Sequence, residues 1–108
     1  MSDNIVVLST VPDISTGRKI AQGILEERLA ACVNIMGGPM ESHYWWEGEI
    51  QRDPEHLLVI KTRRELFVRL EETLRALHPY DVPEVIALPI EQGSPSYLDW
   101  IASETRKE

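Results

Sequence analysis

The order of apolar and polar residues predicts a single α+β domain made of two strand–helix–strand units and an extra C-terminal helix. Two segments carry apolar residues at the spacing of an amphipathic helix, and short apolar runs rich in β-branched residues flank each of them. The chain has 108 residues, about the size of one domain, with 43% hydrophobic and 27% charged residues. We therefore expect one domain over residues 1–108.

The first unit begins with the apolar run from Ile5 to Leu8, which predicts a strand. Pro12 ends this strand, and Asp13 or Ser15 is suited to cap a following helix. From Ile14 to Ala30, apolar residues recur at helical spacing with polar residues between them. These features predict the first strand and the first helix.

Extended structure is expected to follow the first helix. Residues 31–36 predict a second strand, and the aromatic stretch 42–46 resumes extended structure after a Gly-Gly-Pro interruption. The turn is expected at Glu47-Gly48 or at residues 52–54, both of which have turn-forming composition. A strong apolar strand is then predicted at residues 57–62.

The second unit continues with a helix over residues 66–77, which Pro79 stops. Residues 85–90 predict the last strand, and Pro95 is expected to open a short C-terminal helix. This order is the ferredoxin-like split βαβ pattern, in which right-handed crossovers place both helices on one face of an antiparallel sheet.

The predicted strands are apolar on both faces. Alternate residues of a strand point to opposite faces, so a strand with one buried face should alternate apolar and polar residues. The runs at residues 5–8, 57–60 and 85–88 do not alternate. The C-terminal helix is too short to cover the whole second face, and an exposed apolar face usually marks an interface. We therefore expect a homo-oligomer, whose number of subunits this pattern does not determine.

The run Tyr44-Trp45-Trp46 supports the same expectation. Tyr44 and Trp46 should point to one face and Trp45 to the other, so one domain face cannot bury all three. Two interpretations stay open: ordinary core packing, and an edge strand that meets another chain.

Composition excludes several classes of protein. The formal net charge of −7 argues against a nucleic-acid or anionic-membrane binder, and no apolar run approaches the roughly 20 residues that span a bilayer. Cys32 is the only cysteine and we expect it to be a buried, inert thiol. With no signal peptide recognisable, a reducing, cytoplasmic location is expected.

Catalytic motifs are absent from the sequence, so we expect a non-enzymatic protein. It contains no G-x-S-x-G, H-E-x-x-H, C-x-x-C or G-x-G-x-x-G. A small hydrolase of the acylphosphatase type shares the predicted fold, but residues 9–12 lack the anion-binding loop with an arginine that it needs.

The segment from His78 to Glu84 concentrates an imidazole, a phenol and carboxylates between two prolines. His78 has two interpretations: a histidine that stabilises the helix C-terminus, or a ligand for a metal such as copper or zinc. Polar and aromatic residues beside the apolar strands are expected to line an intersubunit ligand cleft, namely Tyr44, Trp46, Lys61, Tyr80 and Glu84.

Several ordered segments resemble the CutA divalent-cation tolerance family. They are Leu29-Ala30-Ala31-Cys32-Val33-Asn34-Ile35, Tyr44-Trp45-Trp46-Glu47-Gly48, Ile60-Lys61-Thr62, His78-Pro79-Tyr80-Asp81-Val82-Pro83-Glu84, Val85-Ile86-Ala87-Leu88-Pro89-Ile90 and Tyr97-Leu98-Asp99-Trp100. The resemblance covers nearly the whole chain. It implies a ferredoxin-like subunit in a tight homotrimer that resembles the PII signalling proteins.

The same resemblance implies a relation to divalent cations, copper in particular, with no required cofactor. In some bacterial relatives the suggested ligands are a cysteine on the first strand and two adjacent histidines before Pro-Tyr. The matching positions here are Ser9, Leu77 and His78, so His78 alone is expected to act as a metal ligand. A PII-like sensor of a small ligand and a trimeric protein-interaction scaffold are the alternative functions.

Overall fold

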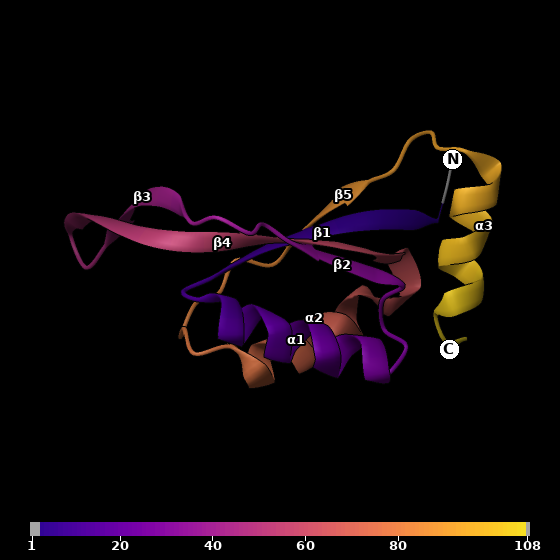
Figure 1. The fold of residues 1–108 in the computed structure, drawn as a ribbon, viewed down its shortest axis with the longest axis horizontal. Coiled ribbons are helices and arrows are strands. Elements are labelled where there is room, and N and C mark those ends of the chain that lie inside the picture. Colours follow the sequence, from indigo (N-terminus) through magenta and orange to yellow (C-terminus); the bar gives the residue numbers. More distant parts are fainter. Residues whose placement is uncertain (1–2, 108) are drawn as a thin grey trace.

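The computed structural model describes residues 3–107 and confirms the predicted order of elements (Figure 1). The elements are β1 (Asn4–Val11), α1 (Ile14–Glu26), β2 (Cys32–Ile35), β3 (Met40–Trp46), β4 (Glu49–Arg63), a 3-10 turn (Arg64–Leu66), α2 (Phe67–Leu77), β5 (Ile86–Pro89) and α3 (Pro95–Glu104).

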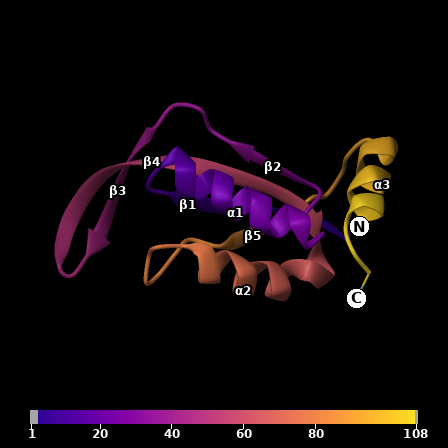
Figure 2. The same cartoon turned by 60° about the horizontal axis from the view of Figure 1, so that its bottom comes forward.

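The sheet has the order β2-β4-β1-β5, and β3 joins the N-terminal half of β4. All of these strand pairs are antiparallel. Both α1 and α2 lie on the same face of the sheet (Figures 1 and 2). This arrangement is the ferredoxin-like α+β fold, as predicted.

The core lies between this sheet face and the two helices. Its members are apolar and at most 2% exposed, and they include Ile5, Val7, Ile20, Ile24, Leu58, Ile60, Leu70 and Leu74. The register places Ile5 opposite Thr62 and Val7 opposite Ile60, on the face that the helices cover. Burying one such side chain stabilises the fold by roughly 1.5–3 kcal/mol.

Helix α1 begins as predicted and ends earlier than predicted. The Asp13 carboxylate accepts a hydrogen bond from the Thr16 N–H at 2.7 Å, which caps the first turn. The helix ends at Glu26, although the apolar spacing continues to Ala30. Arg28 has a φ of 58°, and this left-handed residue turns the chain so that Leu29 reaches the core from outside the helix.

Strand β4 is longer than the apolar pattern indicated, because it continues through residues 49–56 as one arm of a hairpin with β3. The turn is Glu47-Gly48, where both residues have positive φ, as in the two-residue hairpin turns. The alternative turn at residues 52–54 is wrong. Pro54 lies in the part of β4 that pairs with β3 and not with β1. One edge of β4 is therefore unpaired at this position, and proline, which has no N–H to donate, is tolerated in a strand with an unpaired edge.

The β3–β4 hairpin extends beyond the helices as an arm (Figure 1). The molecule measures 43 × 25 × 24 Å, and its radius of gyration of 14.3 Å exceeds the roughly 13 Å expected for a compact chain of this length. Trp45 and Ile50 face each other across the hairpin with 71% and 64% of their surfaces exposed.

The second face of the sheet remains open in the single chain. Val6 pairs with Leu88 and Leu8 with Ile86, and these β5 side chains are 48% and 49% exposed. Helix α3 lies at the end of the sheet where β1 begins and leaves the rest of this face uncovered (Figure 1). The expectation of an apolar face that the chain itself cannot cover is confirmed.

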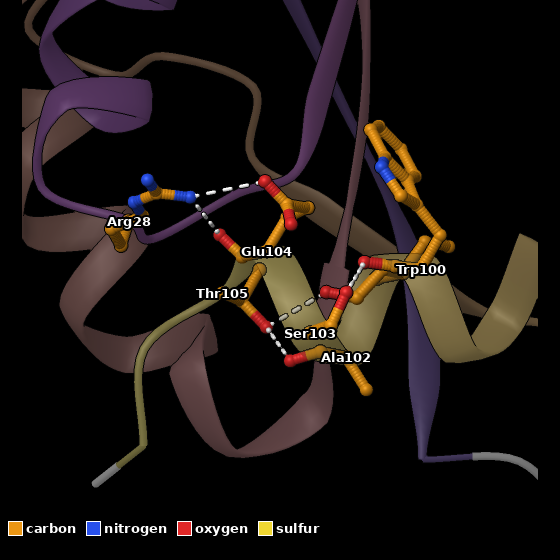
Figure 3. Close-up of polar contacts among 7 residues, drawn as sticks. Arg28, Trp100, Ala102, Ser103, Glu104 and Thr105 are labelled. Atoms are coloured by element: carbon orange, nitrogen blue, oxygen red, sulfur yellow. Dashed lines mark hydrogen bonds and ion pairs between the residues drawn. The ribbon is translucent and has the colours of Figure 1, made fainter.

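Side chains of the preceding elements hold α3 in place. Arg63, buried at the end of β4, donates a hydrogen bond from Nε to the Thr105 hydroxyl at 2.7 Å. Figure 3 shows Arg28 at the C-terminal end of α3, where it donates to the backbone carbonyl of Glu104 at 3.3 Å and to its carboxylate at 3.2 Å. The C-terminal helix is therefore anchored to β4 and to the turn that follows α1.

Candidate functional site

A pocket of about 720 Å³ lies along the hairpin arm. It is lined by residues of β3 and β4, by Thr10 near the end of β1, and by the segment that follows α2. Its aromatic lining residues are Tyr44, Trp45, Trp46 and Tyr80, and its carboxylates are Glu55, Asp81 and Glu84. We call it the hairpin pocket.

Four of the five predicted cleft residues meet in the hairpin pocket. Tyr44, Trp46, Tyr80 and Glu84 line it, although the last two follow α2 and the first two lie on β3. Lys61 is elsewhere: it is on the part of β4 that pairs with β1 and β2, and its ammonium group contacts the Asn34 amide oxygen. Within one chain, therefore, Lys61 is not part of this pocket.

Tyr80 is joined to a buried carboxylate in the pocket. Its hydroxyl donates a hydrogen bond of 2.8 Å to Glu55, a β4 residue that is only 7% exposed. Burial of the phenol, followed by the Glu55 carboxylate, raises the pKa of Tyr80 far above its ordinary value of 10.0. Tyr80 is therefore protonated at neutral pH and acts as a hydrogen-bond donor.

Sequence reasoning missed Glu55. It lies 25 residues from Tyr80, just before an apolar run. A glutamate at such a position is normally expected to be exposed to solvent at the end of a strand. No local signal in the sequence pairs the two residues.

Tyr44 makes a similar contact within the hairpin. Its hydroxyl donates to the Asp53 carboxylate at 2.5 Å. This hydrogen bond is the main cause of the raised pKa of Tyr44, and slight desolvation and the nearby acidic charges add to it. The phenol is therefore protonated at neutral pH, and its hydroxyl hydrogen is already committed to a carboxylate.

His78 is a buried residue, 8% exposed, that connects two parts of the chain. Its Nε2 lies 2.7 Å from the Thr10 carbonyl oxygen, and its Nδ1 accepts a hydrogen bond from the Tyr80 N–H at 3.2 Å. Because a carbonyl only accepts, Nε2 carries the hydrogen and Nδ1 the lone pair. The ring also packs against Tyr80, with 4.7 Å between centroids.

These contacts bear on both interpretations of His78. The residue ends α2, but its ring nitrogens bond to β1 and to the following loop rather than to the last carbonyls of the helix. A metal could bind either nitrogen only after one of these hydrogen bonds was broken. In this geometry His78 positions Tyr80 in the pocket.

Cys32 differs from the buried thiol that was expected. It is half-buried and occupies a position opposite Lys61 on the open face of the sheet. Its Sγ lies 3.9 Å from the Asn34 amide oxygen. Nearby Tyr97 has a raised pKa, mainly because of partial burial and then because of Cys32. Both helices cover the opposite face of the sheet. Cys32 lies on the open face, so its small apolar neighbours in the sequence do not bury it within the single chain.

Two further findings concern residues 3–107. No group of three or more His, Cys, Asp or Glu side chains in this part of the chain is placed to hold a metal ion. The helices found there are also too short or too polar to cross a membrane.

Comparison with known proteins gives a consistent family match. The family described as "CutA1 divalent ion tolerance protein" matches residues 5–104. "Protein CutA 1, chloroplastic" of Oryza sativa subsp. japonica is 54% identical over 104 residues, which are 96% of this chain and 58% of the rice protein. "Divalent-cation tolerance protein CutA" of Thermus thermophilus is 52% identical over 100 residues, which are 93% of this chain and 96% of that protein.

Solved structures show the same likeness. The crystal structure of CutA1 from Oryza sativa has a TM-score of 0.94 at 52% identity and covers 99% of this chain and 97% of that one. The Thermus thermophilus protein has a TM-score of 0.92 at 50% identity, with 95% and 99% covered. The chain spans little more than half the length of the full rice relative. Because sequence and structure match over nearly all of its residues, the chain belongs to the CutA1 divalent ion tolerance family.

Proposed function

We propose that the protein is a non-enzymatic, cytoplasmic divalent-cation tolerance protein that works as a homotrimer and binds a cation in the hairpin pocket. The observation that carries this proposal is the composition of the pocket. Glu55, Asp81 and Glu84 line it together with His43, and no lysine or arginine is among the lining residues. A negative lining on a chain with a net charge of −7 attracts cations.

Assembly with further copies of the chain is supported by the open sheet face, and the number three is what the family resemblance implies. Ile86 and Leu88 are about half exposed on it, and the hairpin arm carries Trp45, which is more exposed still. Apolar area of this kind is stabilised by a partner, and further copies of the chain are the partner that is always present.

Cu(II) or another divalent cation is the proposed metal. Carboxylates and the imidazole of His43 are suitable ligands for borderline metals, and Glu84 is exposed enough to reach an entering ion. His78 becomes a ligand only if its hydrogen bond to Thr10 or to Tyr80 is broken. The two possibilities make different predictions for substituted proteins.

Native mass spectrometry of the full chain, with and without Cu(II), tests the proposal by reading subunit number and bound metal together. We expect a trimer that takes up copper, loses most of it in Glu84→Gln, and keeps it in His78→Gln. Glu72→Gln, on the exposed side of α2, is the matched control and should bind copper normally.

A trimer that stays free of copper would contradict the metal part of the proposal, and a monomer would contradict the assembly. Loss of copper in His78→Gln, with the trimer and circular dichroism unchanged, would instead assign His78 as a ligand.

A small-ligand sensor of the PII-like kind is the second candidate. The observation that favours it is the size of the hairpin pocket, since about 720 Å³ lies within the range of roughly 300–1,000 Å³ typical of small-molecule sites. A bare metal ion would occupy only a small part of this volume.

A further inference from the structure

We propose that the hairpin pocket binds an organic ammonium ion, that is, a positively charged nitrogen carrying carbon substituents. The inference rests on the proposed function in one respect, because both place a cation in the same pocket. It goes further in naming a second class of ligand for this pocket, a weakly hydrated organic cation, beside the divalent cation.

The first observation is the aromatic lining. Tyr44 and Trp46, which share one face of β3, and Tyr80, which follows α2, are aromatic residues that line one pocket from two separate parts of the chain. Aromatic faces carry negative electrostatic potential and attract cations, most strongly those that lose little hydration on binding. Alkylated ammonium ions are of this kind, and proteins bind them through groups of aromatic side chains.

The second observation is the charge of the pocket. Glu55, Asp81 and Glu84 supply negative charge, and the pocket has no lysine or arginine lining it to balance that charge. The imidazole of His43 is held at 2.9 Å by the exposed carboxylate of Glu41. A neutral ligand would displace water from these carboxylates without compensating them, and an anion would be repelled.

The third observation is the state of the two phenols. The Tyr44 hydroxyl donates to Asp53 and the Tyr80 hydroxyl donates to Glu55. Because each hydroxyl hydrogen already has an acceptor, these residues offer a ligand mainly their rings.

The shape of the pocket suits an organic cation at least as well as a metal ion. A metal site needs several ligand atoms converging within about 2–2.5 Å of one point. No such group of three His, Cys, Asp or Glu side chains is found in residues 3–107. The volume of about 720 Å³ and the aromatic walls instead fit a ligand with several carbon atoms.

Choline and its neutral carbon isostere, 3,3-dimethylbutanol, provide the test, because they differ in charge and hardly in shape. Each is titrated into the full chain in its native assembly by isothermal calorimetry, with Cu(II) titrated in parallel. We expect saturable choline binding and at least about tenfold weaker binding of the isostere.

Substitutions locate the binding. Tyr80→Leu removes a ring and should weaken choline binding at least about fivefold, whereas Tyr80→Phe keeps the ring and should retain most of the affinity. Tyr97→Leu removes an aromatic residue of α3 that is outside the pocket and should have no effect. Circular dichroism and subunit number show that each protein is folded.

Equal affinity for choline and its isostere, or no binding of either, would overturn the inference. A loss in Tyr97→Leu as large as that in Tyr80→Leu would overturn the assignment to this pocket. Choline binding without copper uptake would contradict the metal proposal alone, and copper uptake without choline binding would contradict this inference alone.

Discussion

The hydrogen bond between Tyr80 and Glu55 is the residue-level contact that shapes the hairpin pocket. It joins the segment after α2 to β4. His78 positions Tyr80 for this contact, because its Nδ1 accepts a hydrogen bond from the Tyr80 N–H and its ring packs against the Tyr80 ring. A buried carboxylate such as Glu55 requires a donor, and the phenol supplies it. The pocket wall thus depends on His78 and Tyr80, two residues apart, and on Glu55, which lies 25 residues from Tyr80 in the sequence.

Tyr80→Phe should lower the free energy of unfolding at neutral pH by about 1–3 kcal/mol, because the buried Glu55 carboxylate loses the hydroxyl that donates to it. The pKa of Tyr80 is raised in the folded state, so this contribution is present in full below pH 10.0, the ordinary pKa, and is lost as pH rises through the higher folded pKa.

Urea unfolding at several pH values, together with tyrosinate absorbance, measures both effects. The difference between wild type and Tyr80→Phe should shrink only in strong alkali. In Tyr80→Phe the phenol ionising at the highest pH should be missing. A difference that vanishes below pH 9 would contradict the assigned hydrogen bond.

At the level of elements, α3 is held by polar contacts at its C-terminal end as well as by its buried Ile101. Arg63 is buried, donates to the Thr105 hydroxyl at 2.7 Å, and also contacts the Arg106 carbonyl and the Glu65 carboxylate. Arg28 makes an exposed contact with Glu104 at the same end of the helix (Figure 3). The two arginines therefore differ mainly in burial.

Arg63→Met should destabilise the protein by about 2 kcal/mol, since it leaves the Thr105 end of α3 without its charged donor while keeping an apolar stem. Arg28→Ala, the control, should cost less than about 1 kcal/mol because its ion pair is exposed.

Hydrogen exchange of the α3 amides and urea unfolding report the two effects. We expect faster exchange in α3 for Arg63→Met than for Arg28→Ala. Equal exchange in both variants would show that Arg63 does not hold the helix.

At the level of the whole molecule, the open sheet face and the hairpin arm give the chain two surfaces suited to assembly. The helices cover one sheet face completely enough to exclude Leu58 and Ile60 from water, whereas Ile86 and Leu88 remain half exposed on the other. In an obligate assembly, a neighbouring copy would cover Ile86 and Leu88, so that both sheet faces would be shielded from water.

Leu88→Asp should therefore weaken the assembly at least about tenfold, because a carboxylate would be buried without a partner at the interface. Val68→Asp is the matched control, since Val68 is 65% exposed on α2, on the helical side of the molecule. Sedimentation velocity measures both. An unchanged subunit number and stability in Leu88→Asp would contradict burial of this face.

The sequence by itself determined the types and order of the elements, a helix cap at Asp13 or Ser15, the Pro95 start of α3 and the presence of apolar residues on both faces of β1, β4 and β5; the structure decided the cap for Asp13. These features follow from capping chemistry and from the period of apolar residues, which depend on neighbours within a few positions.

Only the tertiary structure decided which side chains meet. It placed Glu55 against Tyr80 and His78 against Thr10, 25 and 68 residues apart, and it separated Lys61 from the other predicted cleft residues. It also extended β4 through Pro54, because pairing with β3 outweighed the local preference of that residue for a turn. Such contacts depend on strand register and on the crossing of distant segments, and local periodicity carries no information about either.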